Sequence, residues 1–180
     1  RSWDFHRKIW NSNFKIQGTD FNYMNKKKTY NINNLIFYIK KLREENLIIG
    51  FTNGCFDLLH QGHLSLLSQA KQKCDFLIVG LNSDSSVRNL KGYDRPIDNE
   101  KIRINKLSAI KDVDALIIFG EETPLKVINK LLPNILFKGS DYKNKEVVGS
   151  VSVIENGGKV EFIEILEGFS TTNIIKNSSI

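Results

Sequence analysis

The chain has 180 residues, 41% of them hydrophobic, which is enough for the core of one ordinary domain. Its formal charge of +6 comes from residues 1–46, which hold ten Lys or Arg and four Asp or Glu, because residues 47–180 hold sixteen of each. This balance argues against a broad nucleic-acid-binding face on the folded part, and no apolar run approaches the roughly 18 residues of a membrane span.

The first segment, residues 1–30, mixes aromatic, Asn and Lys residues without sustained periodicity. We expect it to be a leader, tag or linker that is poorly ordered, and we expect the folded domain to span residues 31–180. A basic and aromatic leader could also bind RNA or an anionic membrane. We predict neither partner, because a tag, linker or flexible tail is the better explanation of this composition.

Helical and strand-like patterns alternate from residue 31 onward. Apolar residues recur at helical spacing after Asn31, a suitable N-cap, which predicts a helix over residues 31–46. Further helices are expected at residues 62–73, 99–110, 124–131, near 148–156 and from 172, and strands at residues 47–52, 75–81, 115–119, 135–138 and 160–165. The alternation predicts an α/β fold in three layers, with helices on both faces of a five-stranded parallel sheet.

Residues 50–63 read GFTNGCFDLLHQGH and join the first predicted strand to the next helix. Such a junction leaves backbone N–H groups without partners at the positive end of the helix dipole, which favours an anion. His60 and His63 are three residues apart and fall on one face of the first helical turn. The pattern predicts phosphate held by imidazoles and backbone, without the Gly-Lys-Ser/Thr of a P-loop.

These residues carry a resemblance to a known family. Residues 52–63 match the HxGH signature of nucleotidyltransferases of the cytidylyltransferase type. Residues 90–97 (LKGYDRPI), 137–142 (FKGSDY) and 168–175 (GFSTTNII) resemble the later motifs of the D-glycero-β-D-manno-heptose 1-phosphate adenylyltransferases, which occur alone or as the C-terminal half of a bifunctional kinase and adenylyltransferase. The resemblance implies a Rossmann-like fold and transfer of AMP from ATP to heptose 1-phosphate, giving ADP-heptose and pyrophosphate for surface polysaccharide synthesis.

The resemblance also implies roles for individual residues. His60, His63 and Lys91 would be catalytic, with Lys91 reaching the α-phosphate from a polar loop at residues 90–95. Nucleotide and phosphate binding is expected at Thr52, Asn53, Gly54, Cys55, Phe56, Arg95, Ser170, Thr171 and Thr172. Sugar-phosphate binding is expected at Asp57, Asn82, Asp84, Lys138, Gly139 and Asp141, which lie at or after the ends of predicted strands. Lys138 could bind the nucleotide instead.

Several of these residues have ordinary structural interpretations as well. Lys91 could be a solvated lysine, the hydroxyls before the last helix could be N-caps, and Asp57 could fix the turn. Arg103 is either a further phosphate contact or a surface charge on its helix. A zinc site at His60, His63 and Asp57 is a weaker alternative, because zinc prefers more nitrogen or sulfur ligands. We predict no metal held by the protein itself, and Mg²⁺ carried by ATP.

The two cysteines, Cys55 and Cys74, form no CxxC pair, which is typical of packing residues in a reducing cytosol. We therefore predict a cytoplasmic enzyme, and the resemblance implies a homodimer that is fused to, or works with, a heptose kinase. Two alternatives stay open. One is a CTP-dependent cytidylyltransferase acting on glycerol 3-phosphate or a similar alcohol phosphate, and the other is a non-catalytic module that binds nucleotide or RNA.

Overall fold

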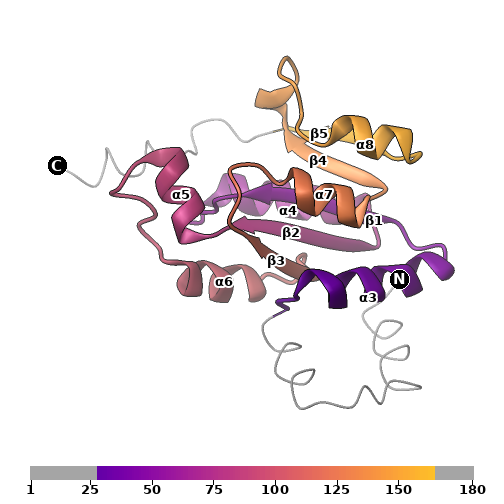
Figure 1. The fold of residues 1–180 in the computed structure, drawn as a ribbon, viewed down its shortest axis with the longest axis horizontal. Coiled ribbons are helices and arrows are strands. Elements are labelled where there is room, and N and C mark those ends of the chain that lie inside the picture. The colour runs from indigo at the N-terminus through magenta and orange to yellow at the C-terminus, as the bar shows by residue number, and fades with distance from the viewer. Residues whose placement is uncertain (1–27, 165–180) are drawn as a thin grey trace, which may run out of the picture.

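The computed structural model describes residues 28–164. Its elements follow one another as α3 (Ile32–Glu44), β1 (Ile49–Gly54), α4 (Gln61–Gln72), β2 (Phe76–Asn82), α5 (Asp84–Lys91), α6 (Glu100–Ser108), β3 (Ala115–Phe119), α7 (Leu125–Leu131), β4 (Ile135–Gly139), a 3-10 turn (Ser140–Tyr142), α8 (Ser150–Glu155) and β5 (Lys159–Ile163) (Figure 1). Within this range no helix has the length and apolar character to cross a membrane. The helix predicted from residue 172 lies outside the described residues.

The five strands form one parallel sheet in the order β3-β2-β1-β4-β5. Phe51 of β1 pairs with Ile78 of β2 on one side and with Leu136 of β4 on the other. The predicted α/β class with a five-stranded parallel sheet is confirmed. Because the chain changes direction across the sheet between β1 and β4, the carboxyl ends of these strands border the crevice where such sheets bind ligands.

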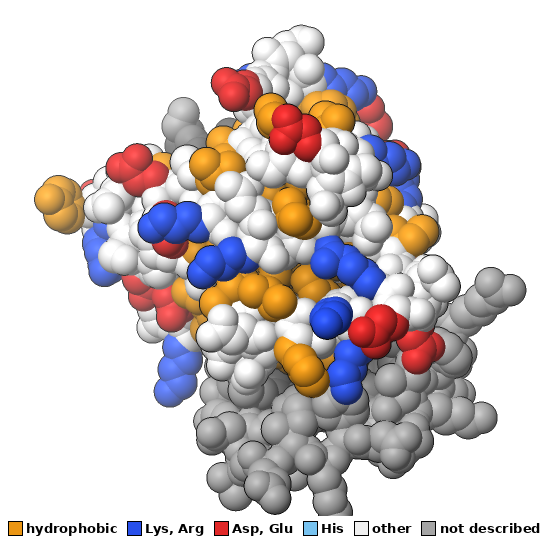
Figure 2. Space-filling view, turned by 45° about the vertical axis from the view of Figure 1, so that its right-hand side comes forward, with side chains coloured by type: hydrophobic (Ala, Val, Ile, Leu, Met, Phe, Trp, Pro, Cys, Tyr) orange, Lys and Arg blue, Asp and Glu red, His pale blue; other side chains and the backbone are white. Residues whose placement is uncertain are grey.

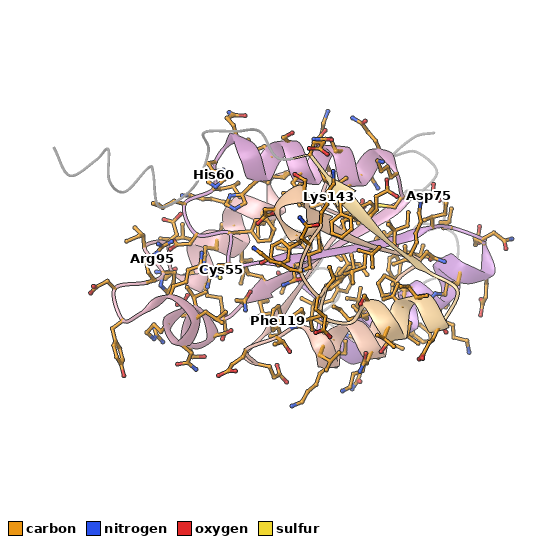
Figure 3. All side chains as sticks on the ribbon, turned by 90° about the horizontal axis from the view of Figure 1, so that it is seen from above. Cys55, His60, Asp75, Arg95, Phe119 and Lys143 are labelled. Carbon is orange, nitrogen blue, oxygen red and sulfur yellow. The ribbon has the colours of Figure 1, made fainter. Side chains whose placement is uncertain are left out.

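Helices cover both faces of the sheet, as the view from above shows (Figure 3). On one face, buried side chains of α3, α7 and α8 pack against Phe51 and Leu136 of the sheet. On the other face, Leu67 of α4 and Leu107 of α6 pack against a second set of sheet residues that includes Phe137. The central strands therefore bury apolar side chains on both faces, which produces the continuous apolar runs seen in the sequence.

The structure differs from the sequence prediction at α5, because a polar loop is predicted around residues 90–95. Two residues of this short helix are buried, so no apolar stripe marks it in the sequence. The available signal is its N-cap, since Ser83 Oγ accepts a hydrogen bond from the Ser86 N–H at 3.2 Å. Lys91 is thus the last residue of a helix, not a loop residue.

The segment just before α3 pairs with the edge of the sheet. The Tyr30 N–H donates to the Leu116 carbonyl at 2.9 Å, and the Leu116 N–H donates to the Lys28 carbonyl at 2.7 Å. Lys28 Nζ donates to the carbonyls of Ile110 and Val113, which follow α6, at 2.8 and 2.7 Å. Residues 28–30, which are predicted to belong to the leader, therefore pack as part of the folded domain.

We expect Lys28→Met to lower the free energy of unfolding by about 1–2 kcal/mol, because two carbonyls lose a charged donor. Urea denaturation measures the change. Lys40→Met, which alters an exposed lysine of α3, is the control and should shift stability by less than about 0.5 kcal/mol. Equal stability losses in the two variants would contradict a role for Lys28 in fixing the edge of β3.

The surface away from the crevice carries mixed charge. Figure 2 brings forward the right-hand side of Figure 1, and there Lys and Arg side chains are interspersed with Asp and Glu. A cavity of about 350 Å³ lies at the end of β3 between α3 and α7. Its lining includes Ile32, Phe119, Lys126 and Lys130 but none of the predicted site residues.

Candidate active site

Predicted site residues gather at the carboxyl ends of β1, β2 and β4. The turn after β1 carries Cys55 and His60, and Lys138 lies near the end of β4. Figure 3 shows Cys55, His60 and Arg95 at one end of the molecule, whereas Asp75, just before β2, lies at the other end. The parallel sheet therefore brings together residues that are far apart in the sequence.

The turn between β1 and α4 has an unusual backbone. Phe56 and Leu58 have φ values of 47° and 52°, a region that side chains other than glycine rarely occupy. The Phe56 ring packs beside Gly54, where an added Cβ would lie 3.2 Å from it. The same ring lies against His63, with centroids 5.1 Å apart. Backbone strain held in place by packing is typical of functional turns.

His60 and His63 stack on each other, with ring centroids 3.8 Å apart and ring planes at 24°. The backbone N–H of His60, the N-cap of α4, donates to Nδ1 of His63 at 3.4 Å. An accepting nitrogen carries no proton, so the neutral His63 ring holds its proton on Nε2 and can donate from there. Nδ1 of His60 is buried and has no hydrogen-bond partner in the described part of the chain. The pair therefore offers imidazole donors beside the N-terminus of α4.

Burial keeps both imidazoles neutral in the free protein. The pKa of His63 falls to about 4, mainly through desolvation and further through the nearby charges of His60 and Lys91. Desolvation also lowers the pKa of His60. A bound polyphosphate would raise both pKa values by supplying negative charge.

Protonation of His63 should make stability depend on pH. Its pKa is about 4 in the folded chain against 6.5 in the unfolded chain, so the unfolded state binds more protons between these values. Stability is therefore lost as the pH falls from 6.5 to 4, and we expect wild type to lose up to about 3 kcal/mol more than His63→Gln over this range. Urea denaturation at several pH values measures the difference, and parallel curves for the two proteins would contradict it.

Lys138 lies beside the end of β1. Its Nζ donates to Oδ1 of Asn53 at 2.6 Å and lies 5.2 Å from the centroid of the Tyr142 ring. The residue is only 9% exposed, and desolvation lowers its pKa to about 8 against the opposing effect of Asp141. Among residues 28–164 no carboxylate forms an ion pair with it. A buried ammonium bound to a neutral amide favours an incoming anion.

Lys91 is exposed at the C-terminal end of α5. Its charge adds to the desolvation that lowers the pKa of His63, and it opposes the desolvation that raises the pKa of Cys55. The ammonium group is therefore within electrostatic range of residues 55–63, the segment that carries His60 and His63 and is called the histidine turn below. Three elements, α4, β4 and α5, thus each contribute a group suited to a phosphate.

Asp57 holds the loop before α6 against the histidine turn. Its carboxylate accepts from Arg95 Nε at 2.6 Å and from the backbone N–H groups of Ile97 and Asp98, each at 3.0 Å. Desolvation would raise the pKa of Asp57, but the hydrogen bonds from Asp98, Ile97 and Arg95 outweigh it, so the pKa is lowered. These contacts favour the turn-fixing interpretation of Asp57 over a sugar-phosphate contact. In addition, Arg95, which is predicted to bind phosphate, donates its Nε–H to Asp57 in this structure.

Arg103 is completely buried, so its interpretation as a surface charge is wrong. Its Nη1 donates to the carbonyls of Cys55 and Asn82, both at 2.7 Å, and its Nε donates to the Asp98 carbonyl at 3.0 Å. Nη2 donates to Oδ1 of Asp84 at 2.7 Å. Four of the five guanidinium N–H donors thus bind protein acceptors, and the Asp84 carboxylate predicted for the sugar is bound within the protein.

The geometry agrees with what sequence comparison shows. The sequence profile of the Cytidylyltransferase-like family matches residues 51–177. The chain belongs to this family. It is a nucleotidyltransferase, as predicted. It is 52% identical over 136 residues to the bifunctional protein HldE of Rhodopseudomonas palustris (strain BisB5), and 55% identical over 137 residues to that of Rhodospirillum rubrum. Each match covers 76% of this chain and 28% of the relative, so the chain spans less than a third of their length.

Solved structures show the same fold. The lipopolysaccharide core biosynthesis protein from Thermoplasma volcanium superimposes with a TM-score of 0.55 at 32% identity, covering 67% of this chain and 97% of that one. The pantoate-beta-alanine ligase from Francisella tularensis gives a TM-score of 0.53 at 18% identity, covering 84% of this chain and 76% of that one, and shares the fold alone. The predicted Rossmann-like nucleotidyltransferase fold is confirmed.

The remaining predicted residues of this nucleotidyltransferase lie as follows. Thr52 is buried at 2% exposure near the end of β1, and Gly139 ends β4. Asp141 is exposed in the 3-10 turn. Ser170, Thr171 and Thr172 lie outside the described residues. In residues 28–164, no three His, Cys, Asp or Glu side chains come together as a metal site.

Proposed function

We propose that this nucleotidyltransferase transfers AMP from ATP to D-glycero-β-D-manno-heptose 1-phosphate, giving ADP-heptose and pyrophosphate for surface polysaccharide synthesis. The observation that carries the proposal is that two groups suited to anions lie at the ends of the paired strands β1 and β4: the stacked neutral histidines follow β1, and the buried Lys138 of β4 binds Asn53 of β1. Two phosphorylated substrates would need such a pair of sites. The similarity to bifunctional HldE proteins and to a lipopolysaccharide core biosynthesis protein supports the choice of sugar.

In the proposed reaction, an oxygen of the sugar phosphate forms a bond to the α-phosphorus of ATP. The bond from that phosphorus to the bridging oxygen breaks, and pyrophosphate leaves with the electron pair. The attacking phosphate is already ionised, so the protein needs no strong base, and its task is to align the reactants and stabilise negative charge. His60 and His63 would donate to the triphosphate, and Lys91 would approach the α-phosphate. Lys138 would hold the sugar phosphate.

The proposal also assigns positions to the other predicted residues. The backbone from Asn53 to Phe56 would line the triphosphate, as would the hydroxyls of Ser170, Thr171 and Thr172. Gly139 and Asp141 would border the sugar phosphate beside Lys138. Asp57 and Asp84 would act by holding Arg95 and Arg103, which shape the crevice.

Mg²⁺ would enter with ATP as a magnesium complex and would reduce the negative charge of the phosphates. Asp57, in the turn between β1 and α4, and Asp84, the first residue of α5, are already bound to Arg95 and Arg103. The residues present therefore fit an ion held by phosphate oxygens and water better than one held in a protein cage. We further propose that the domain is cytoplasmic, forms a homodimer and works with a heptose kinase. Of these three points, the bifunctional names of its relatives support the work with a second activity.

Pyrophosphate release from ATP and from CTP, each with heptose 1-phosphate and with glycerol 3-phosphate, tests the proposal. Turnover confined to ATP with heptose 1-phosphate is the expected result. Turnover with CTP and glycerol 3-phosphate would instead establish the cytidylyltransferase alternative. Tight nucleotide binding without turnover in any pair would favour the non-catalytic module.

A further inference from the structure

We propose that Arg103 is a positioning residue that sets the separation between the histidine turn and Lys91. The proposal rests on the function proposed above and deepens it. The guanidinium binds the histidine turn and the start of α5. Nη1 donates to the carbonyl of Cys55, in the turn that leads to His60, and Nη2 donates to Asp84, the first residue of α5. Lys91 is the last residue of that same helix.

The helix α5 transmits the position of Asp84 to Lys91. It has eight residues and is therefore about 12 Å long. A small tilt of its first turn therefore moves Lys91, at its far end, in proportion to this length. Nη1 of Arg103 also donates to the carbonyl of Asn82 at the end of β2. One planar group thus fixes the turn after β1, the end of β2 and the start of α5 relative to one another.

A second set of contacts closes a ring through the same turn. Arg103 Nε donates to the Asp98 carbonyl, and the Asp98 N–H donates to the Asp57 carboxylate, two residues after Cys55. The loop before α6 is therefore tied to the histidine turn from both sides. A change in the shape of residue 103 would be felt by the turn and by α5 together.

Packing alone does not explain an arginine at this position. A fully buried guanidinium has a large desolvation penalty, whereas Leu107, four residues along the same helix face, fills its site without one. Three of the four acceptors are backbone carbonyls, so the bonds fix directions in which the backbone must lie. Lysine has no planar fork and cannot reproduce these directions.

The test compares Arg103→Lys, Lys91→Met and the double variant in the full chain. We expect Arg103→Lys to lower kcat about 10–100-fold, because displacing a catalytic group by about 1 Å has effects of this size. In the Lys91→Met background, Arg103→Lys should lower kcat by a clearly smaller factor than in wild type, because a displaced Lys91 no longer matters and only the effect on the histidine turn remains. Arg43→Lys is the matched control: Arg43 also donates to backbone carbonyls, those of Leu131 and Leu132, and its change should leave kcat unaltered.

A second readout needs no turnover. The Lys91 charge contributes to the low pKa of His63, after desolvation and beside the effect of His60. An NMR titration of His63 should therefore show a raised pKa in Lys91→Met, a raised pKa in Arg103→Lys, and no further rise in the double variant. If no substrate pair turns over, the proposed function fails while this titration still decides the role of Arg103.

Additive losses of kcat, together with an unchanged His63 pKa in Arg103→Lys, would overturn the proposal. Should Arg103→Lys fail to fold, Asp84→Asn takes its place, because it replaces the charged acceptor at the start of α5 by a neutral one and weakens the bond from Nη2. It is expected to show the same lack of additivity with Lys91→Met. Additive effects of Asp84→Asn and Lys91→Met would equally overturn the proposal.

Discussion

His63→Ala is expected to lower kcat for nucleotidyl transfer about 10²–10³-fold, the loss typical of removing one preorganised donor to a developing charge. The variant removes the Nε2–H that the His60 backbone fixes through Nδ1. It also removes the ring that stacks on His60. Steady-state kinetics at saturating ATP and sugar phosphate measure the effect.

Gln61→Ala is the control for this variant, because Gln61 is exposed one position into the same helix turn. Its kcat should stay within about twofold of wild type, as for surface changes that touch no reacting group. A loss of less than about threefold in folded His63→Ala would show that the histidine pair does not stabilise the transferring phosphate.

Lys138→Met is expected to raise KM for the sugar phosphate about 10–100-fold, because a buried charged donor to its phosphate is lost. The pKa of Lys138 is about 8 in the free protein, so wild type should lose affinity for the sugar phosphate as the pH rises through that value. The neutral amine no longer attracts the phosphate. In Lys138→Met this pH dependence should disappear. Substrate titrations between about pH 7 and pH 9 measure both effects.

The matched control for Lys138 is Lys130→Met, which alters an exposed lysine of α7. It should leave both KM values and their pH dependence unchanged. A rise in KM for ATP in Lys138→Met, without a rise for the sugar phosphate, would move Lys138 to the nucleotide site.

The sheet could be predicted from the sequence because four of its strands, β1 to β4, are largely buried and mostly apolar. β3 has the predicted bounds, residues 115–119, and the other strands shift by one or two residues. The short helix α5 could not be found in this way, because it covers little of the core and its sequence, DSSVRNLK, has no apolar stripe. The signal for α5 in the sequence is Ser83 at its N-cap, but serine is equally common in loops and turns.

Residues of the site were predictable where the backbone alone places them. His60 and His63 share a helix turn, and Lys138 follows an apolar run, so local pattern brings them to the crevice. The partners of Asp57 lie 38 to 41 residues along the chain, and three of the four partners of Arg103 lie 19 to 48 residues away, distances that no local pattern encodes. The sequence sign of Arg103 burial is its spacing of four from Leu107.

The central claim is that the crevice transfers the nucleotidyl group of ATP to a sugar phosphate. The most direct test is to incubate the protein and heptose 1-phosphate with ATP radiolabelled either in its α-phosphate or in its γ-phosphate, and to separate the products. The account predicts that the α-label enters a nucleotide sugar and the γ-label enters pyrophosphate, and that neither transfer occurs with His63→Ala at a comparable rate. Transfer of the γ-label to the sugar, or a nucleotide sugar formed equally fast by His63→Ala, would contradict it.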